Sequence, residues 1–179
     1  MYKFAPASAG ESIVFGAAKP GYGSDRITRW IEFMQDKNIA RICCLLSPSQ
    51  LDRYSDLLGI YRHQFGVDRV CWAPIEDFQL VDSYTLTQQI VPFLKEADRY
   101  NEKAIVHCSG GIGRTGHVLA AWLVGGRGFS NREAIAAVRK TGRNPYEAAI
   151  FAPLKGRNPW SVVAELNALL DECRSDRYD

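Results

Sequence analysis

The stretch His107-Cys108-Ser109-Gly110-Gly111-Ile112-Gly113-Arg114-Thr115 lies between two apolar runs of this chain. Ala104-Ile105-Val106 precedes it, and the run Gly116–Val124 follows it. This order predicts a buried strand, a glycine-rich loop and the start of a buried helix. The backbone N–H groups of such a loop and the positive end of the helix dipole together suit an oxyanion. We therefore expect an anion-binding loop between a strand and a helix.

Cys108 and Arg114 are the reactive residues of this loop. A positive field that binds an oxyanion also favours a thiolate, which is the nucleophilic form of cysteine. The planar guanidinium of arginine binds two phosphate oxygens at once, in a geometry that lysine cannot match. Glycine at 110, 111 and 113 allows the backbone to turn its N–H groups inward. One segment thus supplies a nucleophile and an anion site.

These residues resemble the Cys-x5-Arg signature of the protein tyrosine phosphatase superfamily, in its longer form His-Cys-x-x-Gly-x-x-Arg-Ser/Thr. The resemblance implies that Cys108 attacks phosphorus and forms a cysteinyl-phosphate intermediate, with no metal ion and no other cofactor. It also implies a phosphate-binding set made of Ser109, Gly110, Gly111, Ile112, Gly113 and Arg114. In the family pattern Thr115 hydrogen bonds to the cysteine sulfur, and it can cap the following helix at the same time. His107 is expected to support the loop and the thiolate, and not to transfer a proton.

The proton for the leaving group must come from another segment, because the leaving group lies opposite the nucleophile. Pro74-Ile75-Glu76-Asp77-Phe78 resembles the acid loop of small atypical dual-specificity phosphatases and their prokaryotic relatives. We expect Asp77 to be the general acid, kept protonated by partial burial beside Phe78. Glu76 is the competing acid, and Asp82 is a third candidate that also fits a helix cap.

The step that hydrolyses the intermediate needs a positioned water molecule. The larger tyrosine-specific enzymes use a glutamine for this, and no residue of 144–151 clearly matches it. Asn144 and Glu147 are the two candidates in that region. The chain is also much shorter than those enzymes and lacks their Trp-Pro-Asp acid motif, so it resembles the small dual-specificity enzymes more closely.

Strands alternate with amphipathic helices along the rest of the chain, which is typical of a parallel sheet covered by helices. The pattern predicts strands near 12–15, 39–46, 70–75 and 104–107, and helices that begin at Asp25, Ser47, Asp82, Ser130, Asn144 and Asn158. Ser47-Pro48-Ser49-Gln50 is a capping box, and Gly59 is expected to end its helix. Pro92 is expected to kink the helix after Asp82 or to separate its first turns. The prediction is a single α/β domain over 1–179, with a central, mostly parallel sheet flanked by helices.

The composition is that of a globular protein with nearly balanced charge. The chain has 179 residues, 46% of them hydrophobic, and a net charge of +2, which gives no indication of nucleic-acid binding or membrane insertion. No signal-peptide pattern or membrane-spanning run is present, so the cytoplasm is expected, and the oligomeric state is left open. The five cysteines, at 43, 44, 71, 108 and 173, are odd in number and lack zinc-type spacing. Cys43 or Cys44 can serve as a resolving thiol for Cys108, but core packing is the simpler explanation.

The five residues after Cys108 contain no lysine or arginine, which disfavours a phosphoinositide substrate. The small net charge disfavours an RNA 5′-triphosphate, because it predicts no strong basic groove. A phosphorylated protein is therefore the expected substrate and partner, with phosphotyrosine first and phosphoserine or phosphothreonine in addition if the pocket is shallow. Two other classes stay open: a catalytically weak phosphoprotein-binding module, and another anion-handling cysteine enzyme such as an arsenate reductase or a sulfurtransferase.

Overall fold

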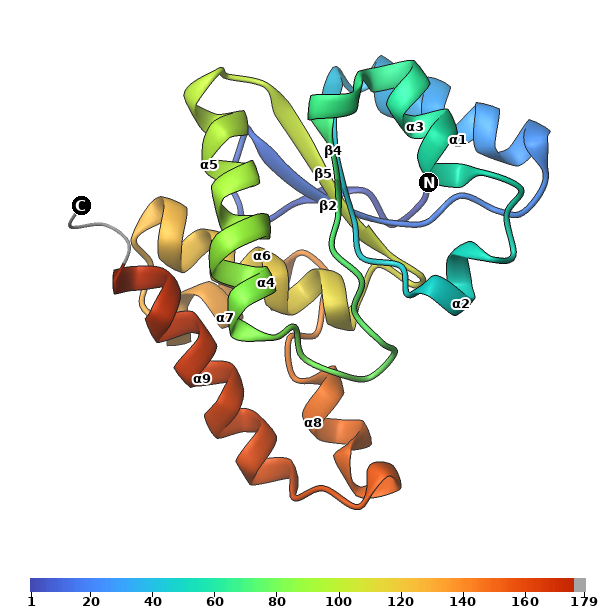
Figure 1. Ribbon diagram of the computed structural model, residues 1–179. Helices are drawn as coiled ribbons and strands as arrows, with labels where there is room; N and C mark the ends of the chain where they lie inside the picture. Colours follow the sequence, from blue (N-terminus) through green and yellow to red (C-terminus); the bar gives the residue numbers. More distant parts are fainter. Residues whose placement is uncertain (176–179) are drawn as a thin grey trace.

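A five-stranded sheet with the order β1-β2-β5-β3-β4 forms the centre of the computed structural model, which describes residues 1–175 (Figure 1). The strands are β1 (Ala5–Pro6), β2 (Val14–Ala18), β3 (Ile39–Cys44), β4 (Val70–Trp72) and β5 (Lys103–Cys108). Four of them are parallel, and β1 pairs antiparallel with β2 at the edge, so the predicted mostly parallel sheet is confirmed. No sequence pattern predicts β1, because a strand of two residues is too short to show a periodicity. The last four residues of the predicted domain, 176–179, lie outside the described residues.

Helices cover both faces of this sheet (Figure 1). One face carries α1 (Ser24–Asp36) and α3 (Leu57–Phe65). The other face carries α5 (Val91–Arg99), α6 (Gly113–Arg127), α7 (Asn131–Lys140) and α9 (Pro159–Ser175). The shorter elements are α2 (Pro48–Leu51), α4 (Ser83–Thr85), α8 (Glu147–Phe151), the π-helical segment η2 (Leu86–Ile90) and the 3-10 segments η1 (Val67–Arg69) and η3 (Ala152–Lys155).

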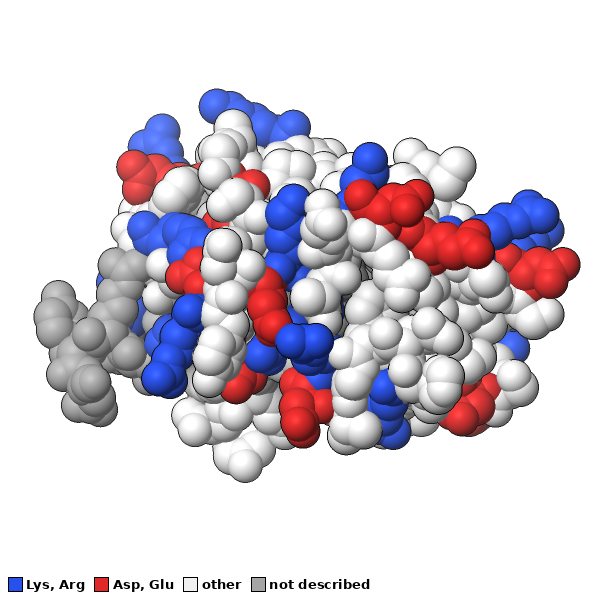
Figure 2. Space-filling view, turned by 90° about the horizontal axis from the view of Figure 1, so that it is seen from above, with Lys and Arg blue, Asp and Glu red and all other residues white. Residues whose placement is uncertain are grey.

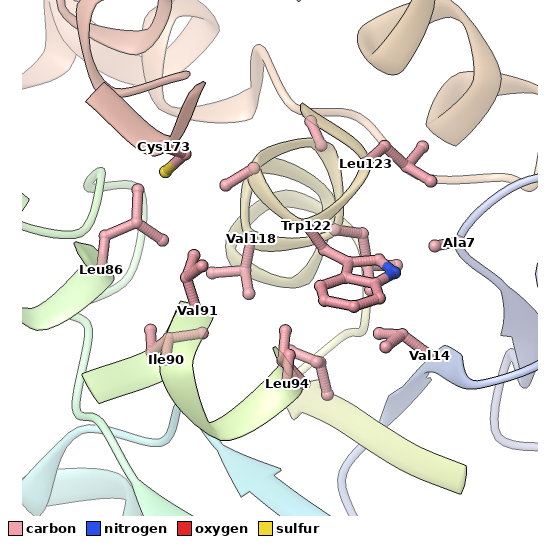
Figure 3. Packing of buried hydrophobic residues seen from close by; sticks show 14 of the residues in the cluster. Ala7, Val14, Leu86, Ile90, Val91, Leu94, Val118, Trp122, Leu123 and Cys173 are labelled. Atoms are coloured by element: carbon pink, nitrogen blue, oxygen red, sulfur yellow. The ribbon is translucent and has the colours of Figure 1, made fainter. Parts of the chain in front are cut away.

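Helix α6 is buried nearly all round, as its sequence predicts. Every residue from Gly113 to Gly125 is buried. Figure 3 shows α6 inside the core, with Val118 beside Val91 of α5 and the Trp122 ring beside Val14 of β2. Because α6 packs against neighbours on every side, its N-terminal end is held firmly relative to the sheet.

The single helix predicted after Ser47 is in fact two helices, α2 and α3. Ser47 caps α2 as expected. A new helix then begins because the Asp56 side chain accepts a hydrogen bond from the backbone N–H of Gly59 (2.9 Å). Gly59 therefore lies in the first turn of α3, and the prediction that it ends a helix is wrong. Gly66, at φ 101°, is the glycine that ends α3.

The helical region after Asp82 is interrupted ahead of Pro92, as predicted. Asp82 caps α4 by accepting a hydrogen bond from the backbone N–H of Thr85 (2.8 Å). The π-helical segment η2 separates α4 from α5. Pro92 lies in the first turn of α5, where its missing N–H leaves no helical hydrogen bond unmade.

The two Asn-Pro pairs near the end of the chain behave differently. Asn158 begins α9 as predicted, and its side chain accepts a hydrogen bond from the backbone N–H of Trp160 (2.9 Å). Asn144 forms a turn instead, because its side chain accepts a hydrogen bond from the backbone N–H of Tyr146 (3.2 Å). Helix α8 therefore begins at Glu147, later than predicted.

Charged side chains of both signs share the surface. Figure 2 looks onto the molecule from above and shows acidic and basic side chains interspersed on that face. Arg41, which is itself buried, pairs with Glu96 and Glu102 at 2.6 Å each, and the exposed Arg69 pairs with Glu102 as well. Among residues 1–175, no helix combines the length and the apolar character that a bilayer crossing requires.

Candidate active site

The signature loop joins the end of β5 to the start of α6. Cys108 is the last residue of β5, and α6 begins at Gly113. The backbone N–H of Gly111 donates a hydrogen bond to Sγ of Cys108 (3.2 Å). Gly111 has a φ of 69°, and a Cβ there would lie 2.5 Å from the carbonyl carbon of Ala17 on β2. The loop can therefore take this path only with glycine at 111.

A cavity of about 230 Å³ opens over this loop. It is lined by Asp77, Phe78, Cys108, Ser109, Gly110, Ile112, Gly113, Arg114 and Glu147. Cys108 is only 2% exposed, so a reactant reaches its thiol through this cavity. The structure thus brings the predicted nucleophile, arginine and acid together, with Glu147 of α8 beside them. We call this space the catalytic cavity.

Three groups hold the guanidinium of Arg114. Its Nη1 donates to the carbonyl oxygen of Ile75 and to Oε1 of Gln50, both at 2.8 Å. Its Nη2 forms an ion pair with one carboxylate oxygen of Asp77. Gln50 donates from Nε2 to the other oxygen of Asp77 (2.8 Å). Asp77, Gln50 and Arg114 therefore form a closed network beside the thiol.

Gln50 belongs to this network, although its sequence pattern predicts only a role in capping a helix. The backbone N–H of Ser47 donates to its side chain (3.3 Å), as the capping box requires. The topology could have predicted the contact of Gln50 with Arg114 and Asp77. Strands β3 and β5 are parallel neighbours, so the residues that follow them lie at the same edge of the sheet. A polar side chain shortly after β3 is therefore placed near the loop that follows β5.

Of the three candidate acids, Asp77 is the one that lines the catalytic cavity. Its side chain is 50% exposed, so the expected burial beside Phe78 is wrong. The Phe78 ring turns toward Phe151 instead, with 4.1 Å between ring centroids. Glu76 is exposed on the same loop. Asp82 caps α4, and the hydrogen bonds from Thr85 lower the pKa of its carboxyl.

His107 lies fully buried behind the loop, between two aromatic rings. Its ring centroid is 5.3 Å from that of Trp30 and 5.7 Å from that of Tyr61. Its Nε2 lies 3.3 Å from the Tyr61 hydroxyl. Burial lowers the pKa of His107 to about 3, with smaller contributions from the charges of Lys19 and Arg114. A neutral, tightly packed imidazole fits support of the loop better than proton transfer.

Thr115 lies in the first turn of α6 and is fully buried. The residue at the helix cap is Ile112, so the expectation that Thr115 caps α6 is wrong. Its hydroxyl finds no hydrogen-bond partner within residues 1–175, and the predicted bond to the cysteine sulfur is not formed. Because the Thr115 hydroxyl has no other partner among the described residues, it can donate a hydrogen bond to the Cys108 sulfur when that sulfur becomes negatively charged during a reaction.

Glu147 lies directly against the signature loop. A Cβ on Gly113 would collide with its carboxylate, which shows how closely the two residues approach. Burial raises the pKa of Glu147, although the charge of Arg114 acts in the opposite direction. Asn144 has a structural role, because its backbone N–H donates to the carbonyl oxygen of Ile112 (3.4 Å) and its side chain holds the turn to α8. Of the two candidates for positioning water, Glu147 is the one that lines the cavity.

A family model described as the dual specificity phosphatase catalytic domain matches residues 33–152. The match spans β3, the acid loop, the signature loop and α8. The chain belongs to the dual specificity phosphatase family. The network around Cys108 lies inside the matched range.

Solved phosphatase structures share the fold of this dual specificity phosphatase. The structure of Tk-PTP in its active form is 26% identical, with a TM-score of 0.67, and the match covers 88% of this chain and 93% of that one. PTPMT1 in complex with PI(5)P is 14% identical, with a TM-score of 0.68 and 97% of each chain covered. Kinase associated phosphatase is 21% identical, with a TM-score of 0.64, and covers 80% of this chain and 88% of that one. At these identities, the last two show a likeness of fold alone.

A viral protein is also similar to part of this phosphatase. The tyrosine phosphatase candidate 123R of Invertebrate iridescent virus 6 is 28% identical over 80 residues. The match covers 45% of this chain and 56% of the viral protein, so it spans little more than half the length of that relative.

Cys43 and Cys44 lie on opposite faces of the sheet of this phosphatase. Cys43 packs in the same core as Cys108, and Cys44 packs in the core under α1 and α3. A hydrogen bond with the Cys71 thiol, together with burial, raises the pKa of Cys43, and burial raises the pKa of Cys44 to about 12. Both are fully buried free thiols, as core packing predicts, and a resolving role stays a prediction.

Proposed function

We propose that this phosphatase removes phosphate from phosphotyrosine in proteins, with phosphoserine and phosphothreonine as secondary substrates, through a cysteinyl-phosphate intermediate and without a metal ion. The observation that supports this most strongly is that the Cys108 thiol, the Arg114 guanidinium and the Asp77 carboxyl line one cavity. The proposed catalytic domain extends over the whole chain, 1–179. A free nucleophilic thiol needs a reducing compartment, so the proposed location is the cytoplasm.

In the first step the substrate phosphate displaces Asp77 from Arg114. The guanidinium then binds two phosphate oxygens, and the backbone amides of 109–114 bind the remaining charge. Sγ of Cys108 forms a bond to phosphorus while the bond to the leaving oxygen breaks, and Asp77 transfers its proton to that oxygen. Because a carboxylate in an ion pair has no proton to donate, Asp77 takes up a proton from solvent once the phosphate has displaced it, and the exchange of partners at Arg114 therefore precedes the chemistry.

In the second step water attacks phosphorus, the S–P bond breaks and the sulfur leaves as a thiolate. Asp77, now a carboxylate, accepts a proton from this water. Glu147 positions the water, because its carboxyl lines the cavity and contacts Gly113. Thr115 turns its buried hydroxyl toward the leaving sulfur, and His107 keeps the loop in place.

The walls of the catalytic cavity favour an aryl phosphate over other phosphate esters. Phe78 and Ile112 line the cavity, and an aromatic ring packs well against such side chains. Residues 109–113 include no lysine or arginine that could bind the further phosphates of a phosphoinositide. A phosphoinositide is the second candidate substrate, since PTPMT1 shares the fold and was solved in complex with PI(5)P.

Turnover of p-nitrophenyl phosphate and of matched phosphotyrosine, phosphothreonine and phosphoserine peptides, all in a chelator, tests the proposal. We expect turnover by the wild type, fastest on phosphotyrosine, and none by Cys108→Ser. The matched control Cys71→Ser, on β4, should stay active. Full activity of Cys108→Ser would refute the mechanism. Tight peptide binding by the wild type without turnover would identify a binding module, and faster release of phosphate from a phosphoinositide would change the substrate class.

A further inference from the structure

A second cavity, of about 280 Å³, adjoins the catalytic cavity. It is lined by Phe78, Gln79, Ala148, Ala152, Lys155, Arg157 and Val162. Phe78 lines both cavities, and Ala148 directly follows Glu147 of the catalytic cavity in α8. A molecule bound at Cys108 therefore has this second space immediately beyond the Phe78 ring. We call it the Lys155–Arg157 cavity.

The inner wall of the Lys155–Arg157 cavity is apolar and firmly packed. Ala148, Ala152 and Val162 are 7%, 2% and 2% exposed and form a small hydrophobic cluster between α8 and α9. The Phe78 ring packs against the Phe151 ring at a tilt of 34°, and Phe78 has a φ of 59°, a backbone conformation that bulky residues rarely adopt. The surrounding contacts must hold Phe78 in that conformation, so the wall between the two cavities is in a defined place.

The polar side of the Lys155–Arg157 cavity carries two positive charges. Nζ of Lys155 donates to the backbone carbonyl of Asp77 (2.6 Å), which keeps the ammonium next to the acid loop. Nη2 of Arg157 pairs with Glu165 at 2.6 Å. An ammonium has three N–H donors and a guanidinium has five, so these two bonds use only part of their capacity. Gln79 adds an uncharged polar group.

We propose that the Lys155–Arg157 cavity binds an anionic side chain of the substrate, on a residue next to the phosphorylated one. The proposal rests on the proposed function, because it presumes a phosphorylated peptide at Cys108. A short apolar stem with a terminal oxyanion matches an apolar inner wall beside two cations. Since an extended peptide advances about 3.3 Å per residue, the anionic residue lies within about two positions of the phosphorylated one.

The same chemistry is available from two sources, a carboxylate and a second phosphate. Both present oxygens that an ammonium and a guanidinium bind, and the phosphate carries more charge at neutral pH. A phosphotyrosine peptide series with glutamate, glutamine, lysine or phosphoserine at each position from −2 to +2 separates them. Glutamate and glutamine have nearly the same shape, so their difference isolates the charge.

The experiment compares kcat/KM for this series between the full-length wild type and the double variant Lys155→Gln/Arg157→Gln. At one position we expect kcat/KM to be roughly fivefold higher for the peptide with glutamate or phosphoserine than for the peptide with glutamine, which is the size of effect that a partly exposed ion pair allows. The peptide with lysine at that position should have a lower kcat/KM than the peptide with glutamine. The preference should disappear in the double variant when each kcat/KM is divided by the same protein's value for p-nitrophenyl phosphate, which corrects for the lost contact between Lys155 and the acid loop. The control Arg29→Gln/Lys37→Gln makes the same change of charge on α1 and at the residue that caps its C-terminal end, across the sheet, and should keep the preference.

Equal kcat/KM values for glutamate and glutamine at every position, with phosphotyrosine still hydrolysed, would overturn this inference alone. So would a preference that survives in the double variant. Hydrolysis of p-nitrophenyl phosphate without hydrolysis of any peptide would count against the proposed function instead. If the double variant lost activity only on phosphoinositide vesicles, the cavity would be a lipid site and the peptide proposal would be wrong.

Discussion

Arg114 and Asp77 form an ion pair inside the catalytic cavity, and Gln50 hydrogen bonds to both of them. In the proposed mechanism Arg114 binds the phosphate and Asp77 protonates the leaving oxygen, so the two groups pair with each other until a substrate arrives. A dianionic phosphate attracts the guanidinium more strongly than one carboxylate does, so binding exchanges the partner of Arg114. The proposed mechanism therefore couples substrate binding to the release of Asp77 from Arg114.

The first prediction concerns this acid. Asp77→Asn should lower kcat on phosphotyrosine peptides by about 10²- to 10⁴-fold, because asparagine keeps the shape but has no proton to give to the leaving oxygen. The loss should be smaller on substrates whose leaving group is already a weak base. Glu76→Gln, one residue away on the exposed side of the loop, is the matched control and should stay near wild-type rates. A larger loss in Glu76→Gln would make Glu76 the acid.

The second prediction uses two neighbouring glycines of the signature loop. Gly111→Ala should lower kcat by about 10²-fold or more, because its Cβ would meet the backbone of Ala17 and displace the loop amides. Gly110→Ala should be nearly neutral, because no atom lies within 4 Å of the added Cβ. Steady-state kinetics with circular dichroism as a folding check would measure this. Equal losses in both variants would mean that the loop does not follow the path described above.

The third prediction assigns Glu147 to the second step. Glu147→Gln should still release the alcohol in a rapid first turnover and then slow by about 10²-fold, because the water is no longer positioned. Burst kinetics and the mass of a phosphorylated protein would detect the intermediate. Burial raises the pKa of Glu147, so its charged form is disfavoured in the folded state, and the protein loses stability as the pH rises from the usual pKa of a glutamate through the raised value. The same variant should therefore have a slightly higher melting temperature at pH 7, and loss of both activity and stability would argue for a structural role.

The sequence predicts the parts of the site that one continuous segment supplies. Cys108 and Arg114 are linked by the strand, loop and helix in which they lie, so their relative placement follows from local structure. The role of Gln50, and the choice of Glu147 over Asn144, depend on how distant elements meet at the edge of the sheet, which no local pattern records. The exposure of Asp77 could not be predicted for a related reason, since it depends on whether Phe78 turns toward the carboxylate or toward another element.

The same distinction applies to the fold. Helices with a clear apolar face, such as α1 and α7, are predicted from their spacing alone. The break between α2 and α3 depends on a single side-chain cap at Asp56, which competes with an otherwise continuous helical pattern. The edge strand β1 exists because β2 offers it unpaired backbone groups, and its own two residues carry no signal.

The fourth prediction concerns Glu11, a buried acid that does not line the catalytic cavity. The Glu11 side chain is 1% exposed and accepts hydrogen bonds from Trp122 (3.1 Å) and from Nε of Arg127 (2.8 Å). Arg127 also pairs with Asp98 at 2.7 Å. Burial alone would raise the pKa of Glu11, but Arg127 and the other hydrogen bonds lower it overall. This arrangement stabilises the fold above the usual pKa of a glutamate, and the stabilisation is lost as the pH falls through the lowered value.

Removal of the cation should reverse this dependence. Arg127→Met leaves the Glu11 carboxylate buried without its cation, although Trp122 and the backbone N–H of Ile13 still donate to it, and should lower the free energy of unfolding at pH 7 by about 3–5 kcal/mol. The Glu11 carboxyl then prefers its protonated form in the folded state, so the variant should lose stability as the pH rises from about 4 to 7, where the wild type does not. Urea unfolding at a series of pH values would measure both effects.

Arg157→Met is the first control variant: it removes an exposed ion pair with Glu165 and should lower the free energy of unfolding by less than about 1 kcal/mol. The double variant Glu11→Leu/Arg127→Met should recover much of the stability, since no unpaired charge stays buried, and failure to do so would place the loss in packing against Trp122 rather than in charge.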